Sequence, residues 1–186
     1  RLYLATPLGI FRSADGGESW TTSAGSAGWV RQIVVHPGDR SRVLAITGSE
    51  LLVSNDFGET FSATAHPGCD FTALAVGPAA PFPIYVGDFW AGIAKSSDGG
   101  VGWGWAPLPM PGMTEPTVHR IVIDPRAPST VYAATATGLH RATDGVVSRS
   151  SWETLRHSAS DMVFDPADGA LIAVDSVGLF RSRDGG

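Results

Sequence analysis

Apolar and polar positions alternate along the chain in short runs that predict strands. Apolar runs such as Ile33–Val35 and Val43–Ile46 are separated by segments rich in glycine and proline. Almost no segment carries apolar residues at the period of about 3.6 that marks an amphipathic helix. Near-continuous apolar runs of this length are typical of strands that are buried on both faces. The pattern therefore predicts an all-β fold with little or no helix.

A polar motif that ends in an aromatic residue recurs through the chain. Its Asp residues stand at 15, 56, 98, 144 and 184, so the intervals are 41, 42, 46 and 40 residues. The fourth copy is degraded and its aromatic is displaced by an insertion, and the fifth copy reaches the last residue of the sequence. The motif residues are Ser13, Asp15, Gly17 and Trp20; Ser54, Asp56, Gly58 and Phe61; Ser96, Asp98, Gly100 and Trp103; Asp144 and Trp152; and Ser182 and Asp184.

A second feature keeps the same period. An apolar run ends at Pro37, Pro78, Pro125 and Pro166, and another apolar run follows each of them after a short gap. Each unit therefore predicts four strands: strand A before the proline, strand B after it, strand C leading into the Ser-x-Asp motif, and strand D starting at the aromatic. Four strands in about 42 residues are the signature of a β-propeller blade.

The repeat boundaries predict a single, partial β-propeller domain over residues 1–186. Blades are expected at about 1–23, 31–65, 72–108, 119–156 and 160–186. The first unit lacks strand A and the last lacks strand D, so about four and a half blades of a larger ring are expected. About six to eight blades would be a common size for the complete ring.

The repeated motif resembles the Asp-box (BNR) repeat family of β-propellers, and the resemblance covers nearly the whole chain. That family includes sialidases, xyloglucan-active glycoside hydrolases, sortilin propellers and photosystem II stability and assembly factors. The resemblance implies that the motifs lie on the outer rim, away from the ligand face. The repeated Asp residues are therefore expected to be structural: Asp accepts hydrogen bonds within the turn, glycine supplies positive φ, and the aromatic anchors strand D.

A basic residue precedes the motif in four of the five units: Arg12, Lys95, Arg141 and Arg181. Strand alternation puts these side chains on equivalent faces of successive blades. Two interpretations stay open. The long side chains cover a neighbouring blade and keep their charge in water, or they form a band that binds a partner.

The D–A and B–C loops form the face opposite the motifs, and this face is the predicted ligand face. A carboxylate and two aromatics, Asp88, Phe89 and Trp90, share one B–C loop, and Trp29 lies in a D–A loop. The proline-rich D–A loop over about 106–118 carries Met110 and Met113, which suit the docking of a partner or form a rigid cover. Aromatics beside a carboxylate suit a sugar site or a protein hot spot. The alternative is that Phe89 and Trp90 pack between blades.

A glycoside hydrolase on this face would need a pair of carboxylates flanking the scissile bond. No spacing in the sequence selects a pair. A sialidase of the family would also carry a Phe/Tyr-Arg-Ile-Pro motif, whereas the Phe11-Arg12 and Phe180-Arg181 pairs here lead into the repeated motif. The main candidate carboxylates are Asp70, Asp88, Glu115 and Asp161, with Glu50 and Asp175 on the same face.

Charge and composition exclude several classes of protein. The net charge is −5 without a basic stripe, so a nucleic-acid partner is not expected. Cys69 is the single cysteine, which excludes an intramolecular disulfide and weakens a sortilin-like interpretation. No apolar run approaches the roughly 20 residues of a transmembrane helix. The five histidines lack metal-ligand spacing, and no cofactor motif is present.

The sequence therefore predicts a non-catalytic propeller, exported to the periplasm, the extracellular space or a lumen, that serves as a binding or assembly scaffold for a protein partner or a larger complex. The photosystem assembly factors within the resembled family suggest this role. The alternative is a secreted glycoside hydrolase, sialidase-like or xyloglucanase-like, that binds a glycan on the D–A and B–C loops.

Overall fold

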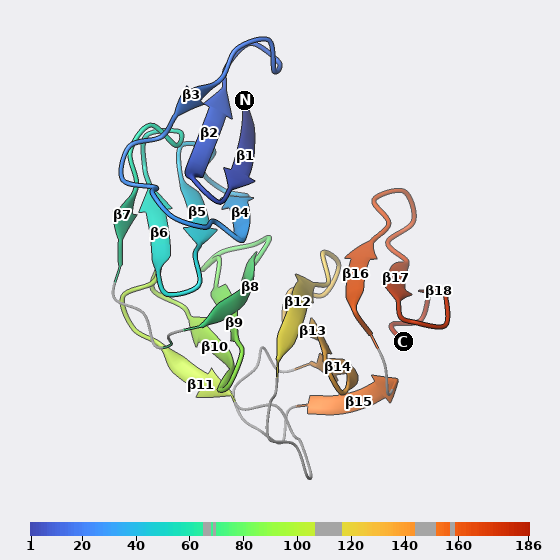
Figure 1. Ribbon diagram of the computed structural model, residues 1–186. Helices are drawn as coiled ribbons and strands as arrows, with labels where there is room; N and C mark the ends of the chain where they lie inside the picture. Colours follow the sequence, from blue (N-terminus) through green and yellow to red (C-terminus); the bar gives the residue numbers. More distant parts are fainter. Residues whose placement is uncertain (65–67, 69, 107–116, 144–151, 157–158) are drawn as a thin grey trace.

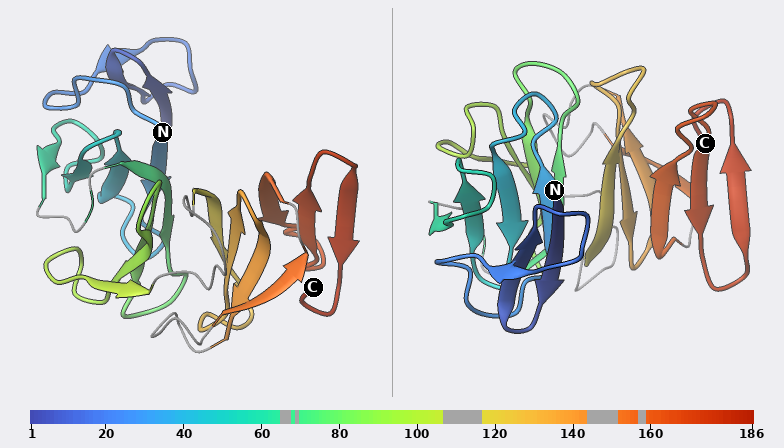
Figure 2. Two further views of the ribbon diagram at one scale, coloured as in Figure 1. Left: turned by 60° about the horizontal axis from the view of Figure 1, so that its bottom comes forward. Right: turned by 90° about the horizontal axis from the view of Figure 1, so that it is seen from above.

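The computed structural model consists of antiparallel sheets that follow one another in chain order along an arc (Figures 1 and 2). It describes residues 1–64, 68, 70–106, 117–143, 152–156 and 159–186. Within these ranges every regular element is a β-strand, which confirms the all-β prediction. The strands are β1 (Leu2–Thr6), β2 (Gly9–Ser13), β3 (Thr21–Thr22), β4 (Gln32–Val35), β5 (Val43–Ile46), β6 (Leu51–Ser54), β7 (Ser62–Ala63), β8 (Phe71–Val76), β9 (Ile84–Asp88), β10 (Gly92–Ser96), β11 (Gly104–Ala106), β12 (Val118–Ile123), β13 (Val131–Thr135), β14 (Gly138–Ala142), β15 (Trp152–Arg156), β16 (Asp161–Phe164), β17 (Leu171–Val174) and β18 (Leu179–Ser182).

Each sheet is a meander in which consecutive strands pair. Strands β4–β7, β8–β11 and β12–β15 form four-stranded sheets, and β1–β3 and β16–β18 form three-stranded sheets. We number these sheets blade 1 to blade 5 in chain order. The strand letters follow the predicted scheme, because blade 1 holds strands B, C and D and blade 5 holds strands A, B and C. The B strands of the middle blades, β5, β9 and β13, are buried along their whole length.

Strand A is less buried than the sequence predicted. In β4, three residues are half-buried and Val35 is 40% exposed. The reason is its position: β4, β8, β12 and β16 are the innermost strands, they contact one another from blade to blade, and they line a common hollow. One edge of each A strand therefore faces this hollow, whereas strand B has a paired strand on both sides.

The repeated motif forms the same hydrogen-bonded turn between strands C and D in each described copy. In blade 2, the Ser54 hydroxyl donates to Asp56 Oδ1 at 2.7 Å and accepts the Gly58 N–H at 2.8 Å. Asp56 in turn accepts the Thr60 N–H at 2.9 Å. Ser13–Asp15 and Ser96–Asp98 repeat the arrangement. We call these turns, together with the one at Ser182–Gly186, the Ser–Asp turns; Asp144 lies outside the described residues.

The aromatic that follows each turn fills the outer gap between its own blade and the preceding blade. Phe61 and Trp152 are each only 6% exposed and belong to clusters with residues of the preceding blade. Trp20 of blade 1, the first sheet of the described residues, is 40% exposed. Strand D starts one residue after the aromatic in β3, β7 and β11 and at the aromatic only in β15, a small correction to the predicted start.

Adjacent blades are joined at the Ser–Asp turns. In each of three turns, the carbonyl of the residue after Asp accepts a hydrogen bond from the preceding blade. This carbonyl belongs to Phe57, Gly99 and Gly185 in blades 2, 3 and 5. The donors are the Tyr3 hydroxyl to Phe57 at 2.9 Å, Arg42 Nη2 to Gly99 at 2.6 Å, and both the Tyr132 hydroxyl at 3.0 Å and Arg141 Nη1 at 2.6 Å to Gly185. We call these contacts the blade joints.

The basic residues before the motif take part in the same junctions. Arg12 forms an ion pair with Glu59 of the next blade at 3.3 Å, and Arg141 reaches Gly185 of the next blade. Arg181 of blade 5 pairs with Asp165 and Asp168 of its own blade. These contacts support the interpretation that the basic residues cover neighbouring structure.

The Ser–Asp turns predict a loss of stability in acid. Hydrogen bonds from the Thr60 side chain, the Thr60 backbone and Ser54 hold the pKa of Asp56 well below its usual value. A depressed folded-state pKa stabilises the protein above the unfolded-state pKa, about 3.9, and this stabilisation is lost as pH falls through the folded-state pKa. We expect the free energy of unfolding, measured by urea denaturation, to decrease below about pH 4.

An Asp56→Asn variant should be less stable than the wild type at pH 7 and should lose less stability on acidification. Glu18→Gln, which removes an exposed carboxylate beside another Ser–Asp turn, is the matched control. Identical pH dependence of Asp56→Asn and wild type would show that this carboxylate does not stabilise the fold.

Candidate functional site

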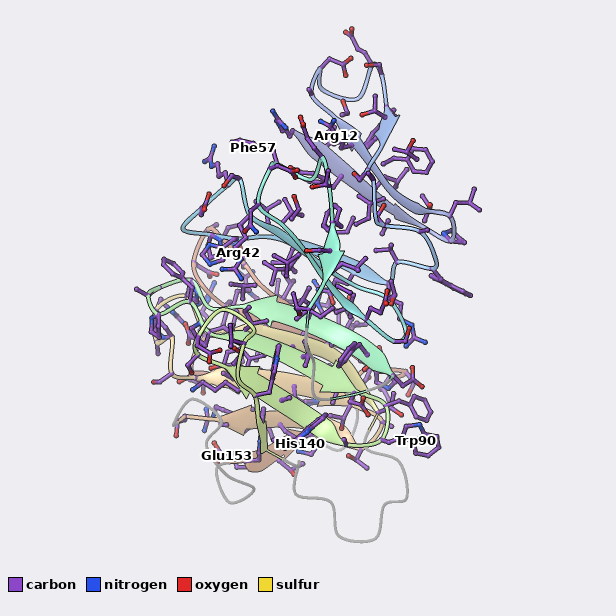
Figure 3. The ribbon with its side chains drawn as sticks, turned by 90° about the vertical axis from the view of Figure 1, so that its left-hand side faces the viewer. Arg12, Arg42, Phe57, Trp90, His140 and Glu153 are labelled. Atoms are coloured by element: carbon purple, nitrogen blue, oxygen red, sulfur yellow. The ribbon has the colours of Figure 1, made fainter. Side chains whose placement is uncertain are left out.

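The predicted ligand face lies opposite the Ser–Asp turns. Figure 3 shows Phe57, in a Ser–Asp turn, and Trp90, in a B–C loop, at opposite sides of the molecule. The arrangement follows from the meander, because alternate connections of an antiparallel sheet emerge at opposite ends. The B–C loops and the described parts of the D–A loops therefore lie on one face, as the sequence predicted.

Asp88 supports this face from within. It ends β9 and is only 1% exposed. Its Oδ1 accepts the N–H groups of Trp90 at 2.8 Å and Ala91 at 3.0 Å, and its Oδ2 accepts the N–H of Asp70 at 3.2 Å. The carboxylate therefore shapes the B–C turn and ties it to the segment that precedes β8. The prediction that Asp88 presents a carboxylate to a ligand is corrected by this burial.

The two aromatics after Asp88 have different environments. The Phe89 and Trp90 rings meet edge to face, with centroids 4.7 Å apart, and the Phe89 N–H donates to the Asp70 carbonyl at 2.9 Å. Trp90 is 56% exposed, so it does not pack between blades. Phe89 supports the ring of Trp90, and the indole remains on the surface.

Trp29 and Trp90 are connected through an ion pair between blades 2 and 3. Trp29 is 70% exposed and stands two residues before Arg31. Arg31 Nη1 donates to the Phe71 carbonyl at 2.8 Å and lies 3.2 Å from Asp70 Oδ1. Since the Asp70 backbone also bonds Phe89 and Asp88, this ion pair fixes the two loops that carry the tryptophans. We call Trp29, Arg31, Asp70 and Trp90 the loop-face patch.

Sequence reasoning missed Arg31. The signal available for it was its position at the end of a D–A loop, directly before a predicted strand A. Its partner could not be identified from the sequence, because Asp70 lies 39 positions further along the chain.

Two of the remaining predicted carboxylates form ion pairs with arginines of the preceding blade. Asp161 pairs with Arg120 at 3.4 Å and accepts the Met162 N–H. Asp175 pairs with Arg156, and hydrogen bonds from the Val177 N–H and then the Gly178 N–H lower its pKa. A low pKa keeps Asp175 ionised, whereas a general acid in a glycosidase needs a raised pKa. Glu50 is exposed.

The structure brings Asp70 and Asp88 together among the predicted hydrolase residues. Asp70 is half-buried and engaged with Arg31, while Asp88 is buried, so the two do not form an open pair of carboxylates. Glu115, Met110 and Met113 lie outside the described residues. Among the residues that are described, no group of three His, Cys, Asp or Glu side chains is placed to hold a metal ion.

No family model and no curated protein sequence matches the chain. Solved structures do. The GH74 xyloglucanase from Xanthomonas campestris is 19% identical over 98% of this chain and 35% of its own, with a TM-score of 0.76. An extracellular domain from B. thetaiotaomicron, described as part of a hybrid two component system, is 15% identical over 98% of this chain and 25% of its own, with a TM-score of 0.78. YCF48 bound to the D1 peptide is 16% identical over 95% of this chain and 58% of its own, with a TM-score of 0.63.

These likenesses establish the fold. The chain spans between a quarter and just over half of the length of these structures. At identities below 20% they do not transfer a ligand or an activity. Together with the sheet order, they confirm the predicted fold class: the chain folds as consecutive antiparallel blades of a β-propeller, three of them four-stranded within the described residues.

The hydrogen bonds of Asp88 predict that its substitution destabilises the fold. In Asp88→Asn one acceptor oxygen replaces two, so at least one N–H group in a buried environment loses its partner. We expect a loss of about 1–3 kcal/mol in the free energy of unfolding, measured in urea.

Asp70→Asn is the matched control, because it removes a neighbouring carboxylate that is partly exposed and paired at the surface. Its expected cost is at most about 1 kcal/mol. Equal losses in the two variants would contradict the structural role of Asp88.

Proposed function

We propose that this propeller is a non-catalytic binding or assembly module that docks a protein partner on the loop-face patch. The observation that carries the proposal is the contrast between the exposed tryptophan side chains and the buried carboxylate of Asp88. Trp29 and Trp90 are 70% and 56% exposed, whereas Asp88 is 1% exposed. Exposed indoles on a fixed base suit binding, and the hydrogen bonds of the buried Asp88 carboxylate to backbone N–H groups favour a structural role for it over a catalytic one.

The residue types of the loop-face patch and its internal ion pair favour affinity for a protein partner. Tryptophan and arginine are the residues that most often dominate protein interfaces. Arg31 and Asp70 link the two loops before a partner arrives, so little ordering of the loops is required on binding. The solved complex of YCF48 with the D1 peptide supports a protein partner, since it places a peptide on a protein of the same fold.

A glycoside hydrolase is the second candidate. The GH74 xyloglucanase with the same fold and the adjacency of Asp70 to Asp88 favour it. Burial of Asp88 and the ion pair of Asp70 with Arg31 oppose it. Indole rings also stack on sugars, so a glycan remains the alternative ligand of the same patch.

Export to the periplasm, the extracellular space or a lumen belongs to the same proposal. One solved structure of this fold is an extracellular domain. Over the described part of the chain, no helix has the length and apolar character to cross a membrane.

Affinity capture with paired variants tests the binding proposal. Immobilised wild type and a Trp29→Ala/Trp90→Ala variant are exposed to extract from the source cells, and bound proteins are quantified by mass spectrometry. The expected result is a defined partner whose recovery falls at least about tenfold in the variant, since truncating a hot-spot side chain costs about 2 kcal/mol.

Val101→Ala is the control, because Val101 is 79% exposed but lies in a Ser–Asp turn on the opposite side. Partners recovered equally by all three proteins would contradict a role for the patch. Turnover of xyloglucan or a sialoside by the wild type, abolished by Asp70→Asn, would instead establish the hydrolase.

A further inference from the structure

The turn between strands A and B of blade 2 is stabilised by the side chain of His36. This histidine is only 8% exposed, and its Nδ1 accepts the Gly38 N–H at 3.2 Å. A ring nitrogen accepts a hydrogen bond only where it carries no proton, so this bond requires the neutral ring with its proton on Nε2. Protonation of Nδ1 turns the acceptor into a second donor and leaves the Gly38 N–H without its partner.

A side chain of blade 3 packs on the same turn. The ring centroid of Phe82 lies 4.8 Å from that of His36. The Phe82 ring also lies against Gly38, so closely that no room is left for a Cβ at this position. Phe82 has a φ of 51°, a conformation that non-glycine residues rarely adopt and that persists only where the surrounding contacts hold it. The ring therefore joins blade 3 to both partners of the hydrogen bond in blade 2.

The environment of His36 favours the neutral ring. Among the described residues, the charged groups that act on this ring are Arg42 and Asp39. Burial and then Arg42 lower the pKa of His36, and Asp39 opposes them. Asp39 is engaged by Ser41, whose N–H donates to it at 2.9 Å and whose hydroxyl donates at 2.6 Å. Arg42 is the donor of the blade joint to Gly99 at 2.6 Å, so a charged His36 would repel the residue that joins blades 2 and 3.

Two further contacts between blades 2 and 3 lie away from this turn. At the inner strands, the Gln32 side-chain amide donates to the Leu74 carbonyl at 2.8 Å and accepts the Leu74 N–H at 2.9 Å. On the loop face, Arg31 pairs with Asp70. Neither contact involves a histidine, so both persist when His36 changes its charge.

We propose that His36 is a pH-sensitive switch that opens the junction of blades 2 and 3 on the side of the Ser–Asp turns. Protonation of the ring breaks the hydrogen bond from Gly38 and separates the turn from Phe82. It also repels Arg42 from the Gly99 carbonyl, while the inner and loop-face contacts act as the hinge. Histidine is the side chain whose charge ordinarily changes between about pH 5 and 8, and its protonation drives local two-state changes of this kind. The inference concerns a different surface from the loop-face patch and does not depend on the proposed function.

The direction of the pH dependence follows from the lowered pKa of His36. A histidine with a lowered folded-state pKa stabilises the folded contacts above its unfolded-state pKa, about 6.5. This contribution is lost as pH falls through the folded-state value. Acid therefore opens the junction, and it does so above the range of about pH 4 in which the Ser–Asp turns lose their stabilisation.

Amide hydrogen exchange at about pH 7.5 and about pH 5.5, corrected for the intrinsic exchange rates, tests the proposal on either side of the ordinary histidine pKa. We expect the Gly38 amide and the Ser–Asp turn of blade 3 to lose protection at the lower pH, while the Leu74 N–H stays protected. His36→Gln, which removes the titrating ring, should abolish this loss. His119→Gln, at an exposed histidine of β12, is the matched control and should retain it.

A second measurement needs only the wild type and so does not depend on how the variant folds. In an NMR titration, the ring signals of His36 and the amide signal of Gly38 should shift with one common midpoint, below about pH 6.5.

Three results would overturn the proposal. One is an equal loss of protection in His36→Gln and the wild type. Another is a Gly38 amide signal that does not follow the titration of the His36 ring. The third is a loss of protection at Leu74 together with Gly38, since the blades would then separate as a whole and the junction would have no hinge.

Discussion

The hydrogen bond from one blade to the turn carbonyl of the next is the interaction on which the architecture depends. A four-stranded sheet has two apolar faces and cannot bury both alone. Apolar contact between sheets is nondirectional, so by itself it does not set how one sheet is rotated against another. The blade joints are directional, because each accepting carbonyl lies in a Ser–Asp turn of fixed shape. Hydrogen bonds of the serine and the aspartate fix that shape, as Ser54 and Asp56 do in blade 2. The turn therefore stabilises its own blade through its internal hydrogen bonds and orients the preceding blade through its carbonyl.

Because the blade joints lie at the Ser–Asp turns, the opposite face of the propeller is available for binding. The rim that carries the Ser–Asp turns is occupied by joints and ion pairs such as Arg12–Glu59. On the loop face, blades 2 and 3 are joined instead by Arg31 and Asp70, and Asp88 fixes the adjoining turn from within. The polar groups here are directed inward and hold loops, while the indoles of Trp29 and Trp90 face solvent. Such an arrangement holds the Trp29 and Trp90 loops in place through Arg31, Asp70 and Asp88.

Much of the fold was predictable from the sequence, and the reason is its repetition. One degraded copy such as that at Asp144 would have carried little weight alone, but five copies with a common period fixed the strand order and placed the Ser–Asp turns on one side. The turn geometry was also predictable, because Ser54, Asp56 and Gly58 interact over only four residues. The blade joints were not, since Tyr3 and Phe57 are 54 residues apart in sequence.

The candidate site was predicted only in outline, for a related reason. Its loop and its aromatics followed from the strand scheme. Whether the Asp88 carboxylate points to solvent or to backbone N–H groups depends on the turn that Trp90 and Ala91 adopt. Asp is a common residue at such turns because it accepts these bonds. A carboxylate next to aromatics is therefore ambiguous in a sequence, and burial decides the matter.

The donors of the blade joints show that the repeat conserves the contact and not the residue. Tyr3 and Tyr132 occupy the second position of strand B in blades 1 and 4, and each donates to the turn carbonyl of the next blade. Blade 2 has Leu44 at that position, and Arg42, just before the strand, donates in its place. An arginine reaches the same carbonyl from a different backbone position because its side chain is long and carries several N–H donors. The requirement set by the turn carbonyl is thus met by two chemistries, which is how repeats that have diverged in sequence keep one geometry.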